Sequence, residues 1–177
     1  MNFKPIIIVS GEPYSIFLEI FFKIKNNKFR RPIIIIVSKK LLLNQMKMLK
    51  FKFKINIIDK KNINYRDLDN KKINIIDVDF KFSKTFDMIS DKSNEYIKEC
   101  FRIAIKLLKT NKYIGMINGP ISKKNFLKEK FLGITEYLAH KTKQKKFAML
   151  IYNKNLSVCP ITTHLPLKDV SKNITKS

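Results

Sequence analysis

Cysteine is scarce in this sequence of 177 residues, which contains only Cys100 and Cys159. Neither has a partner at the spacing of a metal site or a redox pair, and both lie among apolar residues. We therefore expect two reduced, buried thiols in a cytoplasmic protein.

Long apolar runs are also lacking. No run approaches the roughly 20 apolar residues that span a bilayer. The N-terminus passes directly into the strand-like residues 4–10. We therefore expect no membrane association and no signal peptide.

Acidic residues are few: there are 14, against 37 lysines and arginines, and the formal net charge is +23. Such a balance normally suggests a polyanionic partner. Here the lysines are dispersed among isoleucines and asparagines, and arginine, which is favoured for phosphate and base recognition, is scarce. We expect no nucleic-acid partner, although the positive field would attract phosphorylated substrates. A basic binding protein without enzymatic activity remains an alternative, and it predicts lysines clustered on one face.

The four glycines lack the spacing of a Rossmann or P-loop nucleotide site. Gly11-Glu12-Pro13 follows the first apolar run, and Asn118-Gly119-Pro120 follows a later one. The first turn could cradle a phosphate at a helix N-terminus, but a tight strand-to-helix turn is the favoured interpretation. The second lies at the carboxyl end of a predicted strand, where the sites of open α/β folds collect.

What the sequence does contain is a series of short β-branched runs. Continuous runs of this kind are typical of strands buried on both faces of a parallel sheet. The predicted strands span residues 4–10, 32–38, 53–58, 73–78 and 113–117. With helical segments between them, they predict one α/β domain that buries roughly 70% of its unfolded surface if it is complete.

Apolar spacing predicts the helices between these strands. The first starts near Ser15, with an apolar face of Ile16, Leu18, Ile20, Phe21 and Ile24. Ser38 is expected to cap a helix over residues 41–49. A further helix follows Ser90-Asp91, with a stripe of Ile97, Phe101, Ala104, Ile105 and Leu108.

Histidine is nearly absent, and His164 is the more informative of the two. It lies in the turn 162–167, after a β-branched run, and neutral imidazole is the commonest protein metal ligand. A lone histidine is more often simply hydrogen-bonded, so this position alone does not establish a metal site. Strands over 147–152 and 156–162 are expected to form a hairpin that delivers His164, and a helix is expected to begin at Ser171.

Four stretches together resemble one family. They are Gly11-Glu12-Pro13, Asn118-Gly119-Pro120-Ile121-Ser122-Lys123, Gly133-Ile134-Thr135-Glu136-Tyr137-Leu138, and Thr162 to Val170 followed by Ile174-Thr175. In order and spacing they resemble the 4-hydroxythreonine-4-phosphate dehydrogenase (PdxA) family of pyridoxal phosphate (vitamin B6) biosynthesis. The resemblance implies a mostly parallel α/β sheet with helices on both faces, similar to the isocitrate and isopropylmalate dehydrogenases.

The family's proteins continue well beyond the length of this sequence. The resemblance therefore implies an incomplete, N-terminal portion of a catalytic chain. We expect a first α/β portion over about residues 1–118, and the start of the metal- and substrate-binding portion over about residues 119–177.

The resemblance also implies roles for particular residues. His164 matches a metal ligand, Thr135 matches a substrate contact, and Lys123 matches the lysine of a Gly-Pro-x-x-Lys pattern. Lys123 is thus expected to assist catalysis through the substrate phosphate or a proton transfer. Ile134 stands where the family has a histidine and cannot hydrogen-bond, so substrate binding is adapted or weakened. His140 has no counterpart and is expected on a helix surface.

The reaction implied is the NAD- or NADP-dependent oxidation and decarboxylation of 4-phosphooxy-L-threonine to 3-amino-2-oxopropyl phosphate. It implies a divalent metal ion (Zn, Mg or Co), a small phosphorylated substrate, and a homodimer with a shared active site. Because further ligands come from later sequence in the family, this chain is expected to be inactive alone. A related dehydrogenase of a phosphorylated sugar acid, threonate or erythronate phosphate, is the alternative that Ile134 leaves open.

Overall fold

The computed structural model describes residues 3–27, 29–128, 130–163 and 165–174. The chain divides into two compact units, Met1–Phe126 and Leu127–Ser177. Each unit is described by itself below.

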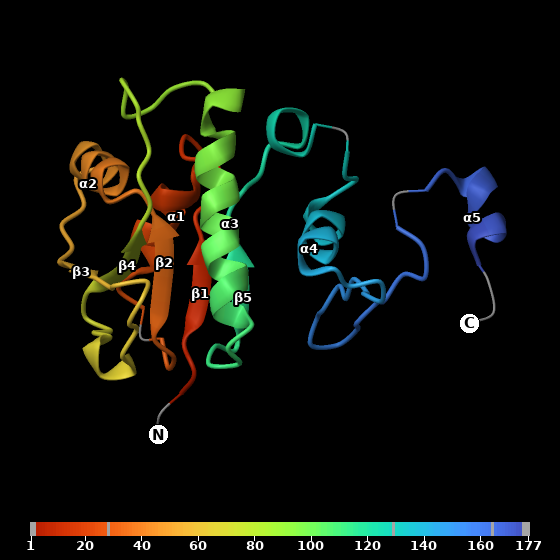
Figure 1. Cartoon of the computed structure of the whole chain (residues 1–177), viewed down its shortest axis with the longest axis horizontal. Coiled ribbons are helices and arrows are strands. Elements are labelled where there is room, and N and C mark those ends of the chain that lie inside the picture. Colours follow the sequence, from red (N-terminus) through yellow and green to blue (C-terminus); the bar gives the residue numbers. More distant parts are fainter. Residues whose placement is uncertain (1–2, 28, 129, 164, 175–177) are drawn as a thin grey trace. The chain divides into compact units, whose positions relative to one another are not determined.

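The first unit contains a five-stranded sheet (Figure 1). Its strands are β1 (Ile6–Val9), β2 (Ile33–Val37), β3 (Ile55–Ile57), β4 (Ile73–Asp77) and β5 (Gly115–Asn118). They lie in the order β3-β4-β2-β1-β5, and every pairing is parallel. Each strand falls where a β-branched run predicted it, and the expected α/β class is confirmed.

Helices cover both faces of this sheet, as predicted (Figure 1). On one face, α1 (Phe17–Ile24) and α2 (Lys39–Met48) pack over Ile8, Ile35 and Ile75 in a single apolar cluster. On the other face, α3 (Asn94–Leu108) contacts β1, β2 and β5. Because successive strand residues point to opposite faces, isoleucine runs fill both layers at once.

The predicted apolar face of α1 is only partly correct. Leu18 and Phe21 are buried together with Phe22, whereas Ile16, Ile20 and Ile24 are all exposed. The helix is apolar almost all round, so its residue spacing did not determine which side meets the sheet.

The other two helices follow their predictions more closely. Ser38 caps α2, and its side chain accepts a hydrogen bond from the Leu41 amide. In α3 the predicted Ile97, Phe101 and Ala104 are buried, whereas the predicted Ile105 and Leu108 are only half-buried. The short helical turns η1 (Tyr65–Asp67) and η2 (Asp91–Ser93) also belong to the first unit, and η3 (Lys123–Leu127) ends at the first residue of the second.

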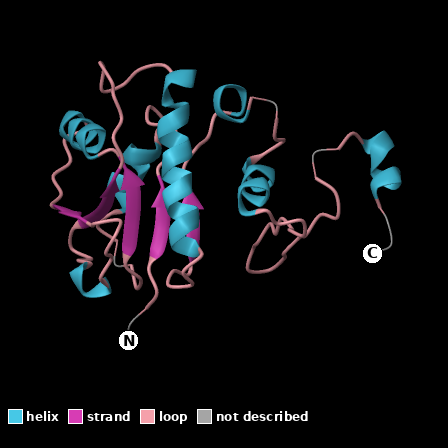
Figure 2. Cartoon of the chain, viewed as in Figure 1, coloured by secondary structure: helices cyan, strands magenta, loops and turns pink. Residues whose placement is uncertain are grey.

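The second unit has little regular structure (Figure 2). It contains α4 (Ile134–Thr142) and α5 (Leu167–Asn173). The hairpin predicted before His164 is reduced to one antiparallel bridge, in which Ile151 and Val158 exchange backbone hydrogen bonds of 2.8 and 2.9 Å. The two predicted strands are therefore wrong, although the predicted pairing is present.

Two further predictions fail in this unit. The last helix begins at Leu167, because Pro166 can precede a helix but cannot lie within one, and not at Ser171 as predicted. Cys159 is exposed, whereas Cys100 is buried. Cys159 lies next to Pro160, outside any strand that could have buried it.

None of the described helices combines the length and the apolar character needed to cross a bilayer.

Candidate functional site

Two glycine turns pack directly against each other at the carboxyl ends of β1 and β5. Gly11 adopts a left-handed backbone with φ of +74°, and a Cβ there would lie 2.4 Å from the Pro120 carbonyl oxygen. A Cβ on Gly119 would lie 2.1 Å from the carbonyl oxygen of Ser10. Real Cβ atoms do not approach so closely, so both positions require glycine. The Gly-Glu-Pro and Asn-Gly-Pro motifs therefore form one structural unit.

Hydrogen bonds within the chain occupy the first turn. The Glu12 amide donates to the Pro120 carbonyl at 2.9 Å, and the Ser15 amide donates to the Glu12 carbonyl at 3.1 Å. These amides are thus not directed at a ligand. This geometry supports the tight strand-to-helix turn over the phosphate cradle.

A buried polar network lies beneath the two turns. The Ser10 hydroxyl and the Tyr96 hydroxyl are 3.0 Å apart, and the Ser38 amide donates to the Tyr96 hydroxyl at 3.1 Å. Burial raises the pKa of Tyr96 well above its usual value, so its hydroxyl stays protonated. The network joins the ends of β1 and β2 to α3.

Glu12 is the residue of this region whose importance the sequence did not reveal. Its side chain is almost fully buried and accepts hydrogen bonds from the Ser93 hydroxyl at 3.0 Å and the Ser122 amide at 3.2 Å. Burial raises the pKa of Glu12, and the two hydrogen bonds oppose that shift. No local signal marks the residue, because its partners lie 81 and 110 positions away along the chain.

Lys123 opens η3, immediately after the second glycine turn. The Ser122 hydroxyl accepts from the Asn125 amide at 3.0 Å and so caps this turn. The Lys123 side chain is exposed, and no hydrogen bond or ion pair joins it to another described residue. Its ammonium group is therefore available to an anion.

Thr135 and Ile134 lie in the first turn of α4, in the second unit. Both are half-buried, and Gly133 precedes the helix at its N-cap. The Thr135 hydroxyl has no hydrogen bond to any described residue. His140 lies on the exposed side of the same helix, as predicted, with its ring 5.2 Å from that of Phe131.

Glu136 connects this helix with the segment that holds the predicted metal ligand. Its Oε1 accepts a long hydrogen bond of 3.4 Å from the Thr163 hydroxyl, and Thr163 directly precedes His164. Its Oε2 is buried and has no hydrogen-bond partner among the described residues. His164 and Thr175 themselves lie outside the described residues. Among those described, no three His, Cys, Asp or Glu side chains gather as a metal site.

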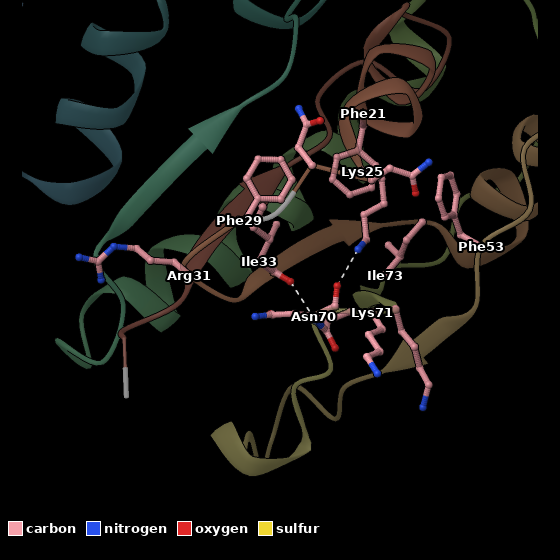
Figure 3. Close-up of a pocket in the computed structure, with 13 residues that line it drawn as sticks. Phe21, Lys25, Phe29, Arg31, Ile33, Phe53, Asn70, Lys71 and Ile73 are labelled. Carbon is pink, nitrogen blue, oxygen red and sulfur yellow. Dashed lines mark hydrogen bonds between the residues drawn. The ribbon is translucent and has the colours of Figure 1, made fainter. Parts of the chain in front are cut away.

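A cavity of about 490 Å³ lies elsewhere, at the amino ends of β2 and β4 (Figure 3). Phe21, Ile33 and Ile73 line it, and the Lys25 ammonium donates to the Asn70 carbonyl at 2.9 Å across one side. None of the four motifs contributes to this cavity. Since sites of open parallel sheets form at the carboxyl ends of the strands, we do not assign the chemistry to it.

The five-stranded parallel sheet, with helices on both faces and paired turns at its carboxyl edge, places the chain among the α/β proteins. The family model described as "Pyridoxal phosphate biosynthetic protein PdxA" matches residues 28–177. The chain belongs to the PdxA family.

Individual relatives agree with this assignment. The 4-hydroxythreonine-4-phosphate dehydrogenase of Sulfurihydrogenibium sp. (strain YO3AOP1) is 34% identical over 96% of this chain and 52% of its own length. That of Colwellia psychrerythraea is 27% identical over 96% of this chain and 52% of its own length. The chain thus spans about half the length of these relatives.

Solved structures share the fold. The crystal structure of a 4-hydroxythreonine-4-phosphate dehydrogenase from Burkholderia phymatum matches with a TM-score of 0.80 at 22% identity, over 96% of this chain and 52% of that chain. The enzyme of the same name from Klebsiella pneumoniae matches with a TM-score of 0.77 at 22% identity, over 94% of this chain and 52% of that chain.

Proposed function

We propose that this chain is the N-terminal part of an NAD- or NADP-dependent dehydrogenase that oxidises and decarboxylates 4-phosphooxy-L-threonine to 3-amino-2-oxopropyl phosphate. The observation that carries the proposal is the family match over residues 28–177, which contains Lys123, Thr135 and His164 in the expected order. We assign residues 1–118 to the first α/β portion and residues 119–177 to the start of the metal- and substrate-binding portion. The reaction belongs to vitamin B6 biosynthesis in the cytoplasm.

Each of the three residues contributes a different interaction. The exposed Lys123 ammonium is suited to the substrate phosphate or to a proton transfer, because it carries a positive charge without a described partner. The Thr135 hydroxyl is free to hydrogen-bond and orient the substrate. His164 provides an imidazole ligand for a divalent ion.

The described residues fit such an ion in one respect. A ligating histidine usually donates its second ring N–H to a carboxylate or carbonyl, which fixes the ring's orientation. The buried Glu136 Oε2 has no described partner, and Glu136 already bonds Thr163, the neighbour of His164. A bound divalent ion would polarise the substrate hydroxyl and stabilise charge on the new carbonyl, and a bound nicotinamide would supply the hydride acceptor.

One histidine does not complete a metal site. A catalytic zinc site, for example, has three protein ligands. We therefore propose that the remaining ligands come from sequence outside these 177 residues, within a homodimer that shares its active sites, and that the chain alone is inactive.

A chimera tests this function. The 177-residue chain is joined to the C-terminal half of the Sulfurihydrogenibium relative, and NADH formation from 4-phosphooxy-L-threonine is followed by absorbance in the presence of Zn²⁺, Mg²⁺ or Co²⁺. We expect turnover by the chimera and none by the chain alone. Turnover by the chain alone would contradict the proposal that the 177-residue chain is inactive by itself.

Matched variants of the chimera test the assigned residues. His164→Ala should remove metal-dependent turnover. Thr135→Val should lower kcat/KM by about 5- to 150-fold, the equivalent of one lost hydrogen bond of about 1–3 kcal/mol. Thr142→Val is the control, because the Thr142 hydroxyl has its described hydrogen bonds within its own helix, to the carbonyls of Leu138 and Ala139.

Ile134 keeps one alternative function open. An isoleucine at this half-buried position accepts no hydrogen bond from a substrate amino or hydroxyl group. A chimera that binds NAD and oxidises phosphorylated threonate or erythronate, but not 4-phosphooxy-L-threonine, would establish the sugar-acid dehydrogenase instead.

A further inference from the structure

Glu12 is a buried carboxylate without a role in the reaction proposed above. It is 2% exposed. A buried carboxylate is costly unless it is hydrogen-bonded, and a neutral or apolar side chain would avoid this cost. The interactions of its two oxygens therefore indicate what the residue does.

The two carboxylate oxygens bind partners on different elements. Oε1 accepts from the Ser122 amide, and Ser122 directly precedes Lys123. Oε2 accepts from the Ser93 hydroxyl at the start of α3. One side chain thus joins the turn after β1 to the residue before Lys123 and to the helix on the far face of the sheet.

The segment after Lys123 is also held. The Asn94 side-chain amide donates to the Asn125 carbonyl at 2.9 Å, which ties η3 to α3. The backbone of Lys123 therefore lies between two anchored residues, Ser122 and Asn125, while its side chain remains exposed. Such an arrangement fixes where a long, flexible side chain begins.

We propose that Glu12 is a positioning residue: by accepting the Ser122 amide it fixes the backbone from which Lys123 reaches the substrate phosphate. This inference rests on the role proposed for Lys123 above.

Two variants of equal side-chain length separate geometry from charge. Glu12→Gln keeps a carbonyl oxygen for the Ser122 amide. Its NH₂ group can donate to the Ser93 hydroxyl, whose one hydrogen is then directed to the Ser90 carbonyl, 2.9 Å away. Glu12→Met has a similar shape but no acceptor for the Ser122 amide.

Hydrogen exchange of the Ser122 amide, measured by NMR on the full 177-residue chain, tests the contact. We expect exchange about tenfold or more faster in Glu12→Met, and within about threefold of the parent chain in Glu12→Gln. Glu95→Met on α3 is the matched control, because the Glu95 side chain is exposed and, among the described residues, pairs with Lys98 alone. Unchanged protection of Ser122 in Glu12→Met would overturn the proposal.

A pH titration of the unmodified chain decides the question if Glu12→Met does not fold. Because burial raises the pKa of Glu12 above its usual 4.5, its carboxyl should titrate above that value. The Ser122 amide proton should shift with the same midpoint. Asp91 and Glu95, the two carboxyls within two residues of Ser93 in sequence, are followed separately, and Tyr14, Lys92 and Lys123 are recorded alongside. A Ser122 amide that does not follow Glu12 would also overturn the contact.

Inorganic phosphate then separates positioning from the function of Lys123. In the parent chain, phosphate should shift the Lys123 signals, and Lys123→Met should abolish the response. Glu12→Met should weaken phosphate binding, and Glu12→Gln should restore it. If Lys123→Met leaves the response to phosphate unchanged, the role proposed for Lys123 is wrong, and so is the positioning role of Glu12 that depends on it. If the response needs Lys123 but is the same in Glu12→Met, only the positioning role is wrong.

Discussion

The two cysteines lie in opposite environments, although their sequence contexts are equally apolar. Cys100 is completely buried in α3, and burial raises the pKa of its thiol to about 12. Cys159 is exposed in the second unit. The thiolate is the reactive form, so the two side chains should react very differently.

Thiol labelling at pH 8 is expected to modify Cys159 within minutes, and Cys100 only on unfolding. Cys159→Ser should remove the fast reaction, and Cys100→Ser should not. The raised pKa of Cys100 also has a consequence for stability: its contribution is complete below about pH 9 and is lost as the pH rises towards about 12, where the thiol ionises even when folded. Fast labelling of the native Cys159→Ser variant would contradict this burial of Cys100.

Candidate site residues could be selected from the sequence only where their motif lies within one short stretch. Lys123 and Thr135 could be selected because their motifs are local. Glu12 and Glu136 could not, because their partners come from distant parts of the sequence. Sequence order identifies side chains of the right chemistry, whereas the fold decides which of them meet.

At the scale of elements, the contact between the two glycine turns gives a sharp test. Gly119→Ala should destabilise the chain by about 1–3 kcal/mol, because its Cβ would overlap the Ser10 carbonyl and both turns would have to move apart. Gly115→Ala in β5 is the matched control, since nothing lies within 4 Å of its added Cβ.

Urea unfolding followed by circular dichroism measures both variants. Gly115→Ala should remain within about 0.5 kcal/mol of the parent chain. Equal midpoints for Gly119→Ala and Gly115→Ala would show that the turns are not packed as described.

The strands were predictable because continuous β-branched runs suit only a sheet that is covered on both faces. The cap at Ser38 was predictable because hydroxyl caps depend on near neighbours. The buried side of α1 could not be predicted, because Phe17–Ile24 is apolar almost all round and tertiary contacts select the face that is buried. The strands predicted over 147–152 and 156–162 also depend on tertiary contacts, because an isolated two-stranded hairpin is only marginally stable.

At the scale of the whole molecule, the two units differ in how much apolar surface they bury. The core lies in the first unit, on both faces of its sheet. In the described part of the second unit, only Leu127, Tyr137 and Ala139 are buried apolar residues. Large apolar side chains there are exposed, among them Ile161 at 83% and Leu167 at 90%. Exposed apolar surface of this extent normally belongs to an interface.

The relatives are about twice as long as the part that this chain matches. The exposed apolar residues of the second unit are consistent with this difference in length. We expect the second unit to be weakly stable in the 177-residue chain and to gain stability when the rest of a relative's chain is present. Lysines are spread over both units, so trypsin has sites throughout and its cleavage reports local opening.

Limited trypsin digestion of the chain alone should cut first within residues 127–177 and leave a stable fragment that ends near residue 126. In the chimera with the C-terminal half of the Sulfurihydrogenibium relative, the same cuts should slow by about tenfold or more, because burial of the exposed apolar residues opposes opening. Mass spectrometry identifies the cut sites in both proteins. Early cleavage inside residues 1–126, or equal rates in the chain and the chimera, would show that the relative's C-terminal half does not stabilise the second unit.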